Sequence, residues 1–540
     1  MQLFQQAGPS LGNQYQQDPY LPYLLQRWFS GAEQAEATAL LERMGEISGG
    51  ELYQLQLADR LNEPVLTQWD PWGERIDQIE VTRLWQRAEA LTVEFGLIAR
   101  PYENPGPLAR VLQFALVYLF TPSNDIYSCP LAMTDGAART LSNAGNAALL
   151  ERALPHLTSR DPAQFWTSGQ WMTELTGGSD VGKTETIARF EDGQWRLYGR
   201  KWFTSAATSQ MTLTLARPEG NGPGGKGLAL FYLEPRDAEG RLQGIETLRL
   251  KDKLGTRKVP TAELLLHGTP ATLVLDAHDG IKNITPMLNI TRTWNSISAI
   301  ALMRRGLNLA WDYARKREAF GARLIDKPLH RQTLLELEAE FAGAFFLTFE
   351  LVHLLGRWEA QTLSEAEQVL LRLLTPVVKL MTGKQAVSVL SEVLECFGGA
   401  GYVEDTGLPL LLRDAQVLPI WEGTTNVLSL DLLRVLARPE QARAVAEIVL
   451  NWTREREQPE LAQAYTSLRQ TFDWLQQHAG DPEALERNAR RVAMSLGRSL
   501  QLLAIQRQRE AVPDTRPGPL PTDLAALQAL YLAQRPLVYL

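Results

Sequence analysis

The sequence predicts an α+β protein that is mainly helical. Residues 1 to about 50 begin irregular and polar. Apolar residues recur at helical spacing from there to about Leu154, and again from about residue 279 almost to the end of the chain. Between these parts, a segment of roughly 110 residues alternates apolar and polar positions, which indicates strands. No helical segments separate these strands, so the pattern excludes a parallel βαβ sheet and favours an antiparallel β domain between two helical parts.

The chain is long enough for several domains, because its 540 residues exceed the usual size of one. We expect an N-terminal extension, an N-terminal helical domain, a β-barrel or β-sandwich domain, a helical bundle and an extra helical C-terminal region. Their predicted ranges are 1–50, 51–165, 166–278, 279–440 and 441–540. Arg438-Pro439 and the segment from Pro513 to Pro521 are expected to break the helical period near the C-terminus.

The β segment contains one strong hairpin signal and one misleading motif. Asp192-Gly193 lies between two alternating runs, and this dipeptide favours a two-residue hairpin turn. Further strands are expected at 211–216, 227–233 and 262–266. The run 220–225 matches G-x-G-x-x-G, but no helix is expected after it, so we interpret it as a loop between antiparallel strands.

Composition points to a soluble, cytoplasmic protein. The chain is 45% hydrophobic and 21% charged, as in ordinary globular proteins. We expect no secretory signal, and no uninterrupted apolar run approaches the length needed to span a membrane. The net charge of -8 gives no general attraction to nucleic acid or to an anionic membrane. The two cysteines, Cys129 and Cys396, fit a reducing compartment, and the six histidines show no metal-ligand spacing, so we expect no metal site.

Two short motifs carry the chemistry. Residues 420–426 (Ile-Trp-Glu-Gly-Thr-Thr-Asn) place one carboxylate, Glu422, in a turn beside an aromatic residue. Residues 172–180 (Met-Thr-Glu-Leu-Thr-Gly-Gly-Ser-Asp) place hydroxyls and flexible backbone in a tight loop. Taken singly, the first motif is most often a solvated turn and the second a generic glycine-rich loop. Their joint presence in the helix–β–helix order is what favours a functional site.

With four further segments, these motifs resemble the acyl-CoA dehydrogenase family, and most closely its AidB-like branch. The resemblance covers roughly residues 50–440 and so implies that family's fold. The four further segments, in chain order, are 199–205 (Gly-Arg-Lys-Trp-Phe-Thr-Ser), 251–257, 313–321 (ending in Arg-Glu-Ala-Phe-Gly) and 397–402 (Phe-Gly-Gly-Ala-Gly-Tyr).

The resemblance implies a role for particular residues. Glu422 matches the catalytic base that removes an α-proton from an acyl-CoA thioester, and Arg292 matches an arginine near the acyl site, although a structural ion pair explains Arg292 equally well. Residues that match FAD-binding positions are Met172, Thr173, Gly178, Ser179, Phe203, Thr204, Ser205, Arg317, Phe320, Gly398, Gly399, Thr424 and Asn426.

Partners also follow from the resemblance. It implies an acyl-CoA substrate, an electron-transfer flavoprotein as acceptor, and a homotetramer in which Arg317 and Phe320 reach FAD of a neighbouring subunit. Some positions depart from the family pattern: Phe203 stands where a ring-stacking Trp is usual, Trp202 comes one position earlier, and Ala319 replaces a hydroxyl residue.

Three functions remain open at this point. The first is an FAD-dependent acyl-CoA dehydrogenase. The second is an AidB-like flavoprotein that associates with DNA and protects it from alkylation, and the third is an acyl-binding regulator with little turnover. Residues 441–540 hold twelve Arg and no Lys against eleven Asp and Glu. Arg487, Arg490, Arg491 and Arg498 share helical spacing and offer one local basic patch, but a solvated, salt-bridged helix face is the favoured interpretation, so DNA ranks second.

Overall fold

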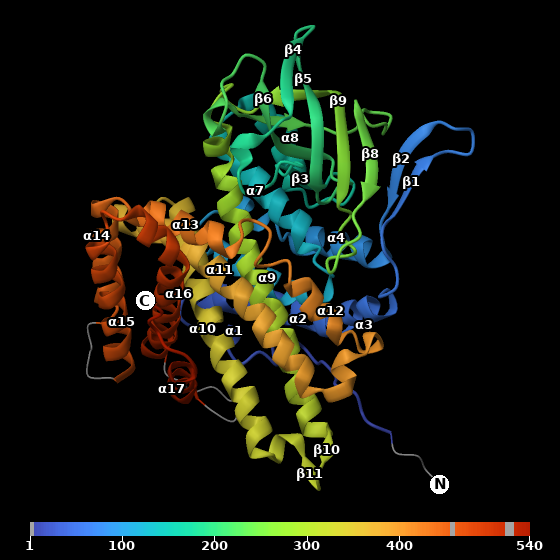
Figure 1. The fold of residues 1–540 in the computed structure, drawn as a ribbon. Coiled ribbons are helices and arrows are strands. Elements are labelled where there is room, and N and C mark those ends of the chain that lie inside the picture. The colour runs from blue at the N-terminus through green and yellow to red at the C-terminus, as the bar shows by residue number, and fades with distance from the viewer. Residues whose placement is uncertain (1–4, 454–458, 513–522) are drawn as a thin grey trace. The chain divides into compact units, whose positions relative to one another are not determined.

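The computed structural model describes residues 5–453, 459–512 and 523–540, which form two compact units (Figure 1). The helical unit contains Met1–Leu57, Asn104–Ser123 and Asn295–Leu540. The β-containing unit contains Ala58–Glu103 and Asn124–Trp294. The long helix α9 (Gly280–Lys316) begins in the β-containing unit and continues into the helical unit. The predicted α+β, mainly helical class is confirmed.

The strands of the β-containing unit close into a ring. Strand β6 pairs with β4, β4 with β5, β5 with β9, β9 with β7, and β7 with β6 again, while β3 joins β6 and β8 joins β9. Trp171, Leu197, Phe231 and Leu264 are among the buried residues that form its core. The strands are β3 (Ser168–Trp171), β4 (Ile187–Glu191), β5 (Gln194–Thr204), β6 (Met211–Pro218), β7 (Ala229–Leu233), β8 (Ile245–Leu250) and β9 (Ala262–Leu273).

The predicted hairpin lies between β4 and β5. Asp192 (φ 51°) and Gly193 (φ 79°) are both in the left-handed region, as a two-residue turn of this type requires. Glu191 pairs with Gln194 directly across the turn. The G-x-G-x-x-G run also lies where it was expected, in the connection between the antiparallel strands β6 and β7. Both predictions are therefore confirmed.

One hairpin lies in a region for which we expected helical spacing. Strands β1 (Val65–Trp69) and β2 (Arg75–Glu80) pair antiparallel around a turn in which the Asp70 carboxylate accepts hydrogen bonds from the backbone N–H groups of Trp72 and Glu74. Asp70-Pro71 and Gly73 are the local turn signal that a helical period over the longer window obscures. The helices of this unit are α4 (Arg83–Phe95), α5 (Arg100–Glu103), α7 (Ser128–Ala144) and α8 (Ala147–Leu157).

The helical unit packs around α10, α11 and α16. Its helices are α1 (Leu21–Leu25), α2 (Gly31–Gly49), α3 (Glu51–Ala58), α6 (Ala109–Phe120), α10 (Pro328–Glu359), α11 (Glu365–Cys396), α12 (Leu408–Ala415), α13 (Thr425–Leu436), α14 (Pro439–Asn451), α15 (Pro459–Gln477), α16 (Pro482–Ala511) and α17 (Leu524–Gln534). Helix α10 is long and apolar enough to cross a membrane, but 94% of its apolar window is buried inside the protein, so we interpret it as a core helix.

Two helices of this unit start at residues that favour a helix N-terminus. Helix α11 starts with a capping box in which the Ser364 hydroxyl accepts from the Glu367 N–H and the Glu367 carboxylate accepts from the Ser364 N–H. Helix α14 starts at Pro439, which confirms the predicted break at Arg438-Pro439. The second predicted break, from Pro513 to Pro521, lies outside the described residues.

A buried ion pair ties the N-terminal residues to the long helices. The Glu338 carboxylate on α10 accepts hydrogen bonds from Arg304 (2.6 and 2.9 Å) and Trp311 (2.7 Å) of α9 and from the Tyr20 hydroxyl (3.1 Å). Each of these side chains is buried. Because a buried charge is tolerated only when it is paired and hydrogen-bonded, this cluster explains why Tyr20 and its neighbours are ordered against the bundle.

We predict that stability of the helical unit falls below neutral pH because of His353. This imidazole of α10 stacks on Trp28 (ring centroids 4.8 Å apart), and its burial lowers the pKa of His353 to about 4. The unfolded chain binds the proton near pH 6.5, so the free energy of unfolding decreases as pH falls from 6.5 towards 4, by roughly 3 kcal/mol in full.

His353→Phe removes this titration and keeps a stacking ring. Urea midpoints at pH 7 and pH 5 should therefore show the variant gaining stability relative to the parent as the pH is lowered. A difference between variant and parent that does not change with pH would contradict the assignment.

Candidate functional site

The loop 172–180, which follows β3, is anchored by a buried carboxylate. Glu174 is buried and accepts hydrogen bonds from the Lys201 ammonium (2.7 Å), the Thr186 hydroxyl (2.6 Å) and the Glu185 N–H (2.6 Å). Burial raises the pKa of Glu174, but Lys201 and these hydrogen bonds outweigh burial, so its pKa lies below the usual range. Lys201 is fully buried on β5, and burial lowers its pKa despite Glu174. The loop is thus tied to the barrel at its base.

A bulge in β5 presents two aromatic residues next to this loop. The pairing of β5 with β9 shifts by one residue between Lys201 and Thr204, which is the signature of a β-bulge. The backbone N–H of Trp202 donates to the carbonyl of Thr173 (2.9 Å), so the bulge and the loop are joined directly. Phe203 is 46% exposed, and the Lys251 ammonium lies 3.4 Å from the Trp202 ring centre and 4.5 Å from that of Phe203.

The hydroxyl groups of the loop 172–180 and of the β5 bulge differ in exposure and in hydrogen bonding. Thr204 is buried, and its hydroxyl donates to the Ala262 carbonyl (2.6 Å), so Thr204 acts through its backbone if it contacts a cofactor at all. Ser205 is half-buried and shares a hydrogen bond with the Thr261 hydroxyl (3.2 Å). Ser179 is exposed, and Thr173 and Met172 are half-buried. A Cβ atom on Gly178 would lie 2.7 Å from the Thr173 hydroxyl oxygen, so this position accepts only glycine without a shift.

In the helical unit, Glu422 lies in the turn between α12 and α13. Its φ of 55° is in the left-handed region, and Gly423 follows with φ 100°. Such a conformation costs a non-glycine residue roughly 1–3 kcal/mol and persists only where the surroundings enforce it. The indole N–H of Trp421 donates to the Asn295 side chain, and the Thr424 hydroxyl caps the N-terminus of α13. Glu422 is half-buried and Asn426, on α13, is exposed.

The remaining predicted residues of this unit lie on exposed backbone or at an exposed tip. Gly398 (φ 58°) and Gly399 begin the short helix Gly398–Tyr402, and a Cβ atom on either would meet nothing within 4 Å. Phe320 (φ 51°) is 97% exposed at the tip of the small hairpin formed by β10 (Glu318–Ala319) and β11 (Ala322–Arg323), and Arg317 donates to the Gln6 side chain (3.0 Å).

The two predicted groups of residues therefore fall into separate units. The β-containing unit brings together Met172, Thr173, Gly178, Ser179, Phe203, Thr204 and Ser205 on one loop and one bulge, and it also carries the half-buried Arg292 on α9. The helical unit carries Glu422, Thr424 and Asn426 on one turn and helix start, with Gly398, Gly399, Arg317 and Phe320 on other segments. Sequence analysis did not identify the residues that hold these segments. They are Glu174 and Lys201 for the loop 172–180, Asn295 for Trp421, and Lys379, whose ammonium donates to the carbonyls of Trp421 and Gly423.

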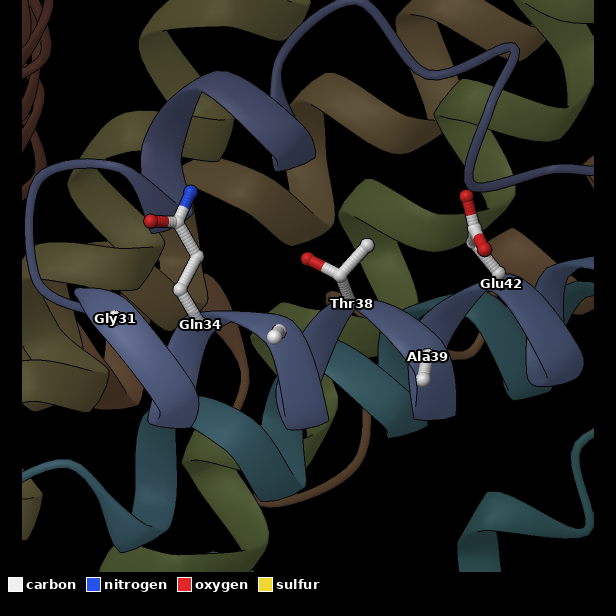
Figure 2. Close-up of a pocket in the computed structure, with 6 residues that line it drawn as sticks. Gly31, Gln34, Thr38, Ala39 and Glu42 are labelled. Atoms are coloured by element: carbon white, nitrogen blue, oxygen red, sulfur yellow. The ribbon is translucent and has the colours of Figure 1, made fainter.

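A shallow hollow on the helical unit is lined by none of the predicted site residues. It has a volume of about 430 Å³ and lies along α2, lined by Gly31, Gln34, Ala35, Thr38, Ala39 and Glu42 (Figure 2). Small and polar side chains line it, and Glu42 is the one charged group among them. We assign it no function.

Comparison with known proteins identifies the family. Residues 169–269 match the acyl-CoA dehydrogenase middle domain, residues 278–437 match the acyl-CoA dehydrogenase C-terminal domain, and residues 8–162 match the N-terminal domain of the adaptive response protein AidB. Acyl-CoA dehydrogenase family member 11 of Caenorhabditis elegans is 47% identical over 448 residues, which cover 81% of this chain and 73% of the relative. The chain belongs to the acyl-CoA dehydrogenase family.

The match to the AidB N-terminal domain and one further relative place it in the AidB-like branch. The putative acyl-CoA dehydrogenase AidB of Escherichia coli is 31% identical over 435 residues, covering 78% of each chain. The crystal structure of C. elegans ACDH-11 in complex with C11-CoA superposes with a TM-score of 0.94 at 40% identity, covering 99% of this chain and 93% of that one. Enzymes of this family are FAD-dependent oxidoreductases that act on acyl-CoA, and the predictions of family, enzyme class and FAD are confirmed.

The four arginines of α16 that share helical spacing are not all exposed. Arg487, Arg490 and Arg491 are exposed, but Arg498 is only 2% exposed. Arg498 donates to the Glu340 carboxylate (2.6 Å) and lies 3.7 Å from the Tyr531 ring centre. Arg498 faces the interior, so the less favoured interpretation, a local patch of all four arginines, is wrong. Arg487 is paired with Glu483, as expected for a salt-bridged helix face.

The surroundings of Cys396 disfavour nucleophilic chemistry of its thiol. Burial and the nearby carboxylates Glu392 and Glu395 raise the pKa of its thiol to about 12. The thiol therefore stays protonated at physiological pH, and the thiolate that nucleophilic chemistry requires does not form.

We predict that the Glu174–Lys201 pair stabilises the loop 172–180. Lys201→Met leaves the buried carboxylate without a cation, so the free energy of unfolding of the β-containing unit should fall by about 3–5 kcal/mol. Adding Glu174→Gln, which retains the hydrogen bonds from Thr186 and Glu185, should recover a large part of this loss.

Chemical denaturation and the FAD content of the purified variants measure this effect. If Lys201→Met unfolds at the parental denaturant concentration, the pair is not a stabilising element. If the double variant is less stable than Lys201→Met, the loss does not come from an unpaired charge.

Proposed function

We propose that this protein oxidises the Cα–Cβ bond of an acyl-CoA thioester to the enoyl-CoA, with Glu422 as the base that takes the α-proton. The observation that carries this proposal is the placement of Glu422. In a family of acyl-CoA oxidoreductases, its carboxylate is presented from a left-handed turn that neighbouring side chains hold in place. Strained backbone of this kind is concentrated at functional sites.

The predicted residues of the β-containing unit and those of the helical unit each have chemistry that suits FAD. Thr173, Ser179, Ser205 and the close approach at Gly178 suit contacts with the ring and the pyrophosphate, and Phe203 offers an exposed aromatic face. Gly398, Gly399 and Asn426 suit the adenosine end, because they offer exposed backbone and an exposed amide. When bound, FAD supplies the acceptor for the hydride that leaves Cβ. The protein residues bind the thioester, orient it and hold the proton on Glu422.

The substrate and redox partner are narrower proposals. The C11-CoA bound to the ACDH-11 relative makes a medium-length acyl-CoA the first ligand to test. An electron-transfer flavoprotein is the acceptor that the family implies. We also propose a cytoplasmic location, since Cys129 and Cys396 are both free thiols.

DNA association remains the second candidate because of the AidB relationship. The burial of Arg498 weakens the case for DNA association, and the net charge of -8 gives no compensating attraction.

A visible spectrum of the purified protein and anaerobic titration with acyl-CoAs of graded length, including undecanoyl-CoA, test the primary proposal. A protein that takes up FAD but whose flavin none of these thioesters bleaches would contradict it.

We predict that Glu422→Gln keeps FAD and still binds acyl-CoA but reduces flavin at least ~10³-fold more slowly, because the amide cannot accept the α-proton. Stopped-flow absorbance under anaerobic conditions measures the rate. Glu392→Gln, at an exposed position of α11, is the control and should reduce flavin at the parental rate. Rapid bleaching in Glu422→Gln would show that another group takes the proton.

We propose a homotetramer, and Phe320 provides its test. The family resemblance implies that Phe320 reaches a neighbouring subunit, and its 97% exposure at a hairpin tip leaves the ring available for that contact. Phe320→Ser should therefore weaken assembly and lower FAD content without unfolding the chain, whereas Phe190→Ser, at a second exposed phenylalanine, should not. Sedimentation velocity and FAD stoichiometry measure both. A parent protein that is monomeric with full FAD would refute the tetramer.

A further inference from the structure

A buried lysine donates hydrogen bonds to the carbonyl oxygens of the two residues that flank Glu422. Lys379 lies in the middle of α11 and is fully buried. Its ammonium donates hydrogen bonds to the carbonyl oxygens of Trp421 and Gly423, each at 2.6 Å. The backbone is therefore fixed immediately before and immediately after Glu422.

The same face of α11 holds the approach to the turn. Gly383 is one helical turn beyond Lys379, and residues four apart share a helix face. A Cβ atom at Gly383 would lie 3.1 Å from backbone atoms of Leu418 and Pro419, so the helix and the 418–419 backbone are in close contact. The Trp421 indole is held separately by Asn295 of α9. Two long helices thus fix the residues that lead into Glu422.

We propose that Lys379 is the positioning residue of the catalytic base: by binding the carbonyls of Trp421 and Gly423, it holds Glu422 in the left-handed conformation from which its carboxylate meets the α-proton. This inference rests on the proposed role of Glu422. Lys379 itself acts through the backbone and takes no proton in the reaction.

The chemistry of lysine suits this task. An ammonium group is a compact donor of three hydrogen bonds on a flexible stem, so it can serve two carbonyls that converge from one side. Hydrogen bonds from a charged donor are also stronger than those between neutral groups. Both carbonyls lose their donor when the ammonium is removed, and the left-handed residue between them is then free to relax towards an ordinary conformation.

The test compares Lys379→Met with Lys258→Met in the FAD-loaded protein. Lys258 is a matched control in the other unit, because it is 5% exposed and its ammonium also donates to two backbone carbonyls, those of Asp59 (2.6 Å) and Asn62 (2.7 Å). We expect Lys379→Met to reduce flavin about 100-fold more slowly at saturating acyl-CoA, as expected for a reacting group displaced by about 1 Å. The half-saturating acyl-CoA concentration should change less than threefold. Lys258→Met should lose stability but keep the parental reduction rate.

Two further measurements separate position from protonation and from folding. The reduction by Lys379→Met should stay slow at high pH, where carboxylates are ionised in any case; recovery to the parental rate there would overturn the proposal. Hydrogen–deuterium exchange should speed up at residues 420–424 in Lys379→Met, and unchanged exchange would also overturn it. If the Met variant does not fold, Lys379→Leu, which also lacks a donor, is measured instead, and a parental rate in that folded variant would refute the role.

The outcome is distinct from failure of the proposed function. Should Glu422→Gln reduce flavin at the parental rate, Glu422 is not the base, and a loss of rate in Lys379→Met would then have another origin. Should Glu422→Gln be inactive while Lys379→Met reduces flavin at the parental rate, Glu422 is the base but Lys379 does not position it.

Discussion

Both segments that carry the candidate chemistry are irregular backbone, and each is fixed by one buried lysine from a neighbouring regular element. Lys201 of β5 holds the loop 172–180 through Glu174, and Lys379 of α11 holds the Glu422 turn through two backbone carbonyls. Loops supply functional groups in many folds because a rigid scaffold sets their position. Here the scaffold acts in large part through two ammonium groups, beside the hydrogen bonds that Trp202 and Asn295 make with the same segments.

Both lysines are buried and donate hydrogen bonds to the segment that they hold. Lys201 faces a carboxylate, so the charges compensate each other, although burial still lowers the pKa of Lys201. Lys379 donates to two carbonyl oxygens of the Glu422 turn. Since removal of one partner from such an arrangement leaves buried polar atoms unsatisfied, stability and site geometry are coupled at both places. A substitution at either lysine therefore has to be judged by structure and by reaction rate together.

Local chemistry was predictable from the sequence and long-range contacts were not. The Asp192-Gly193 hairpin, the loop after β6 and the start of α14 each follow from residues within a few positions of one another. Lys379 gave no such signal, because its partners lie on a different segment and are backbone atoms, which any sequence supplies. The β5 bulge was hidden for a related reason: an extra residue in one strand is defined only by its pairing with β9.

The arginines of α16 show what helical spacing leaves undetermined. Spacing shows which residues share a side of the helix, but not whether that side is buried. The buried side can also carry an arginine when a carboxylate pairs with it and an aromatic ring packs against it. Arg498 is received in this way by Glu340 and Tyr531, whereas Arg487, Arg490 and Arg491 face solvent. The arginine that appeared to extend a nucleic-acid surface instead joins α16 to α10 and α17. The same contacts that stabilise this C-terminal region thus reduce the charge that DNA binding would require, which leaves acyl-CoA oxidation as the function that the structure supports best.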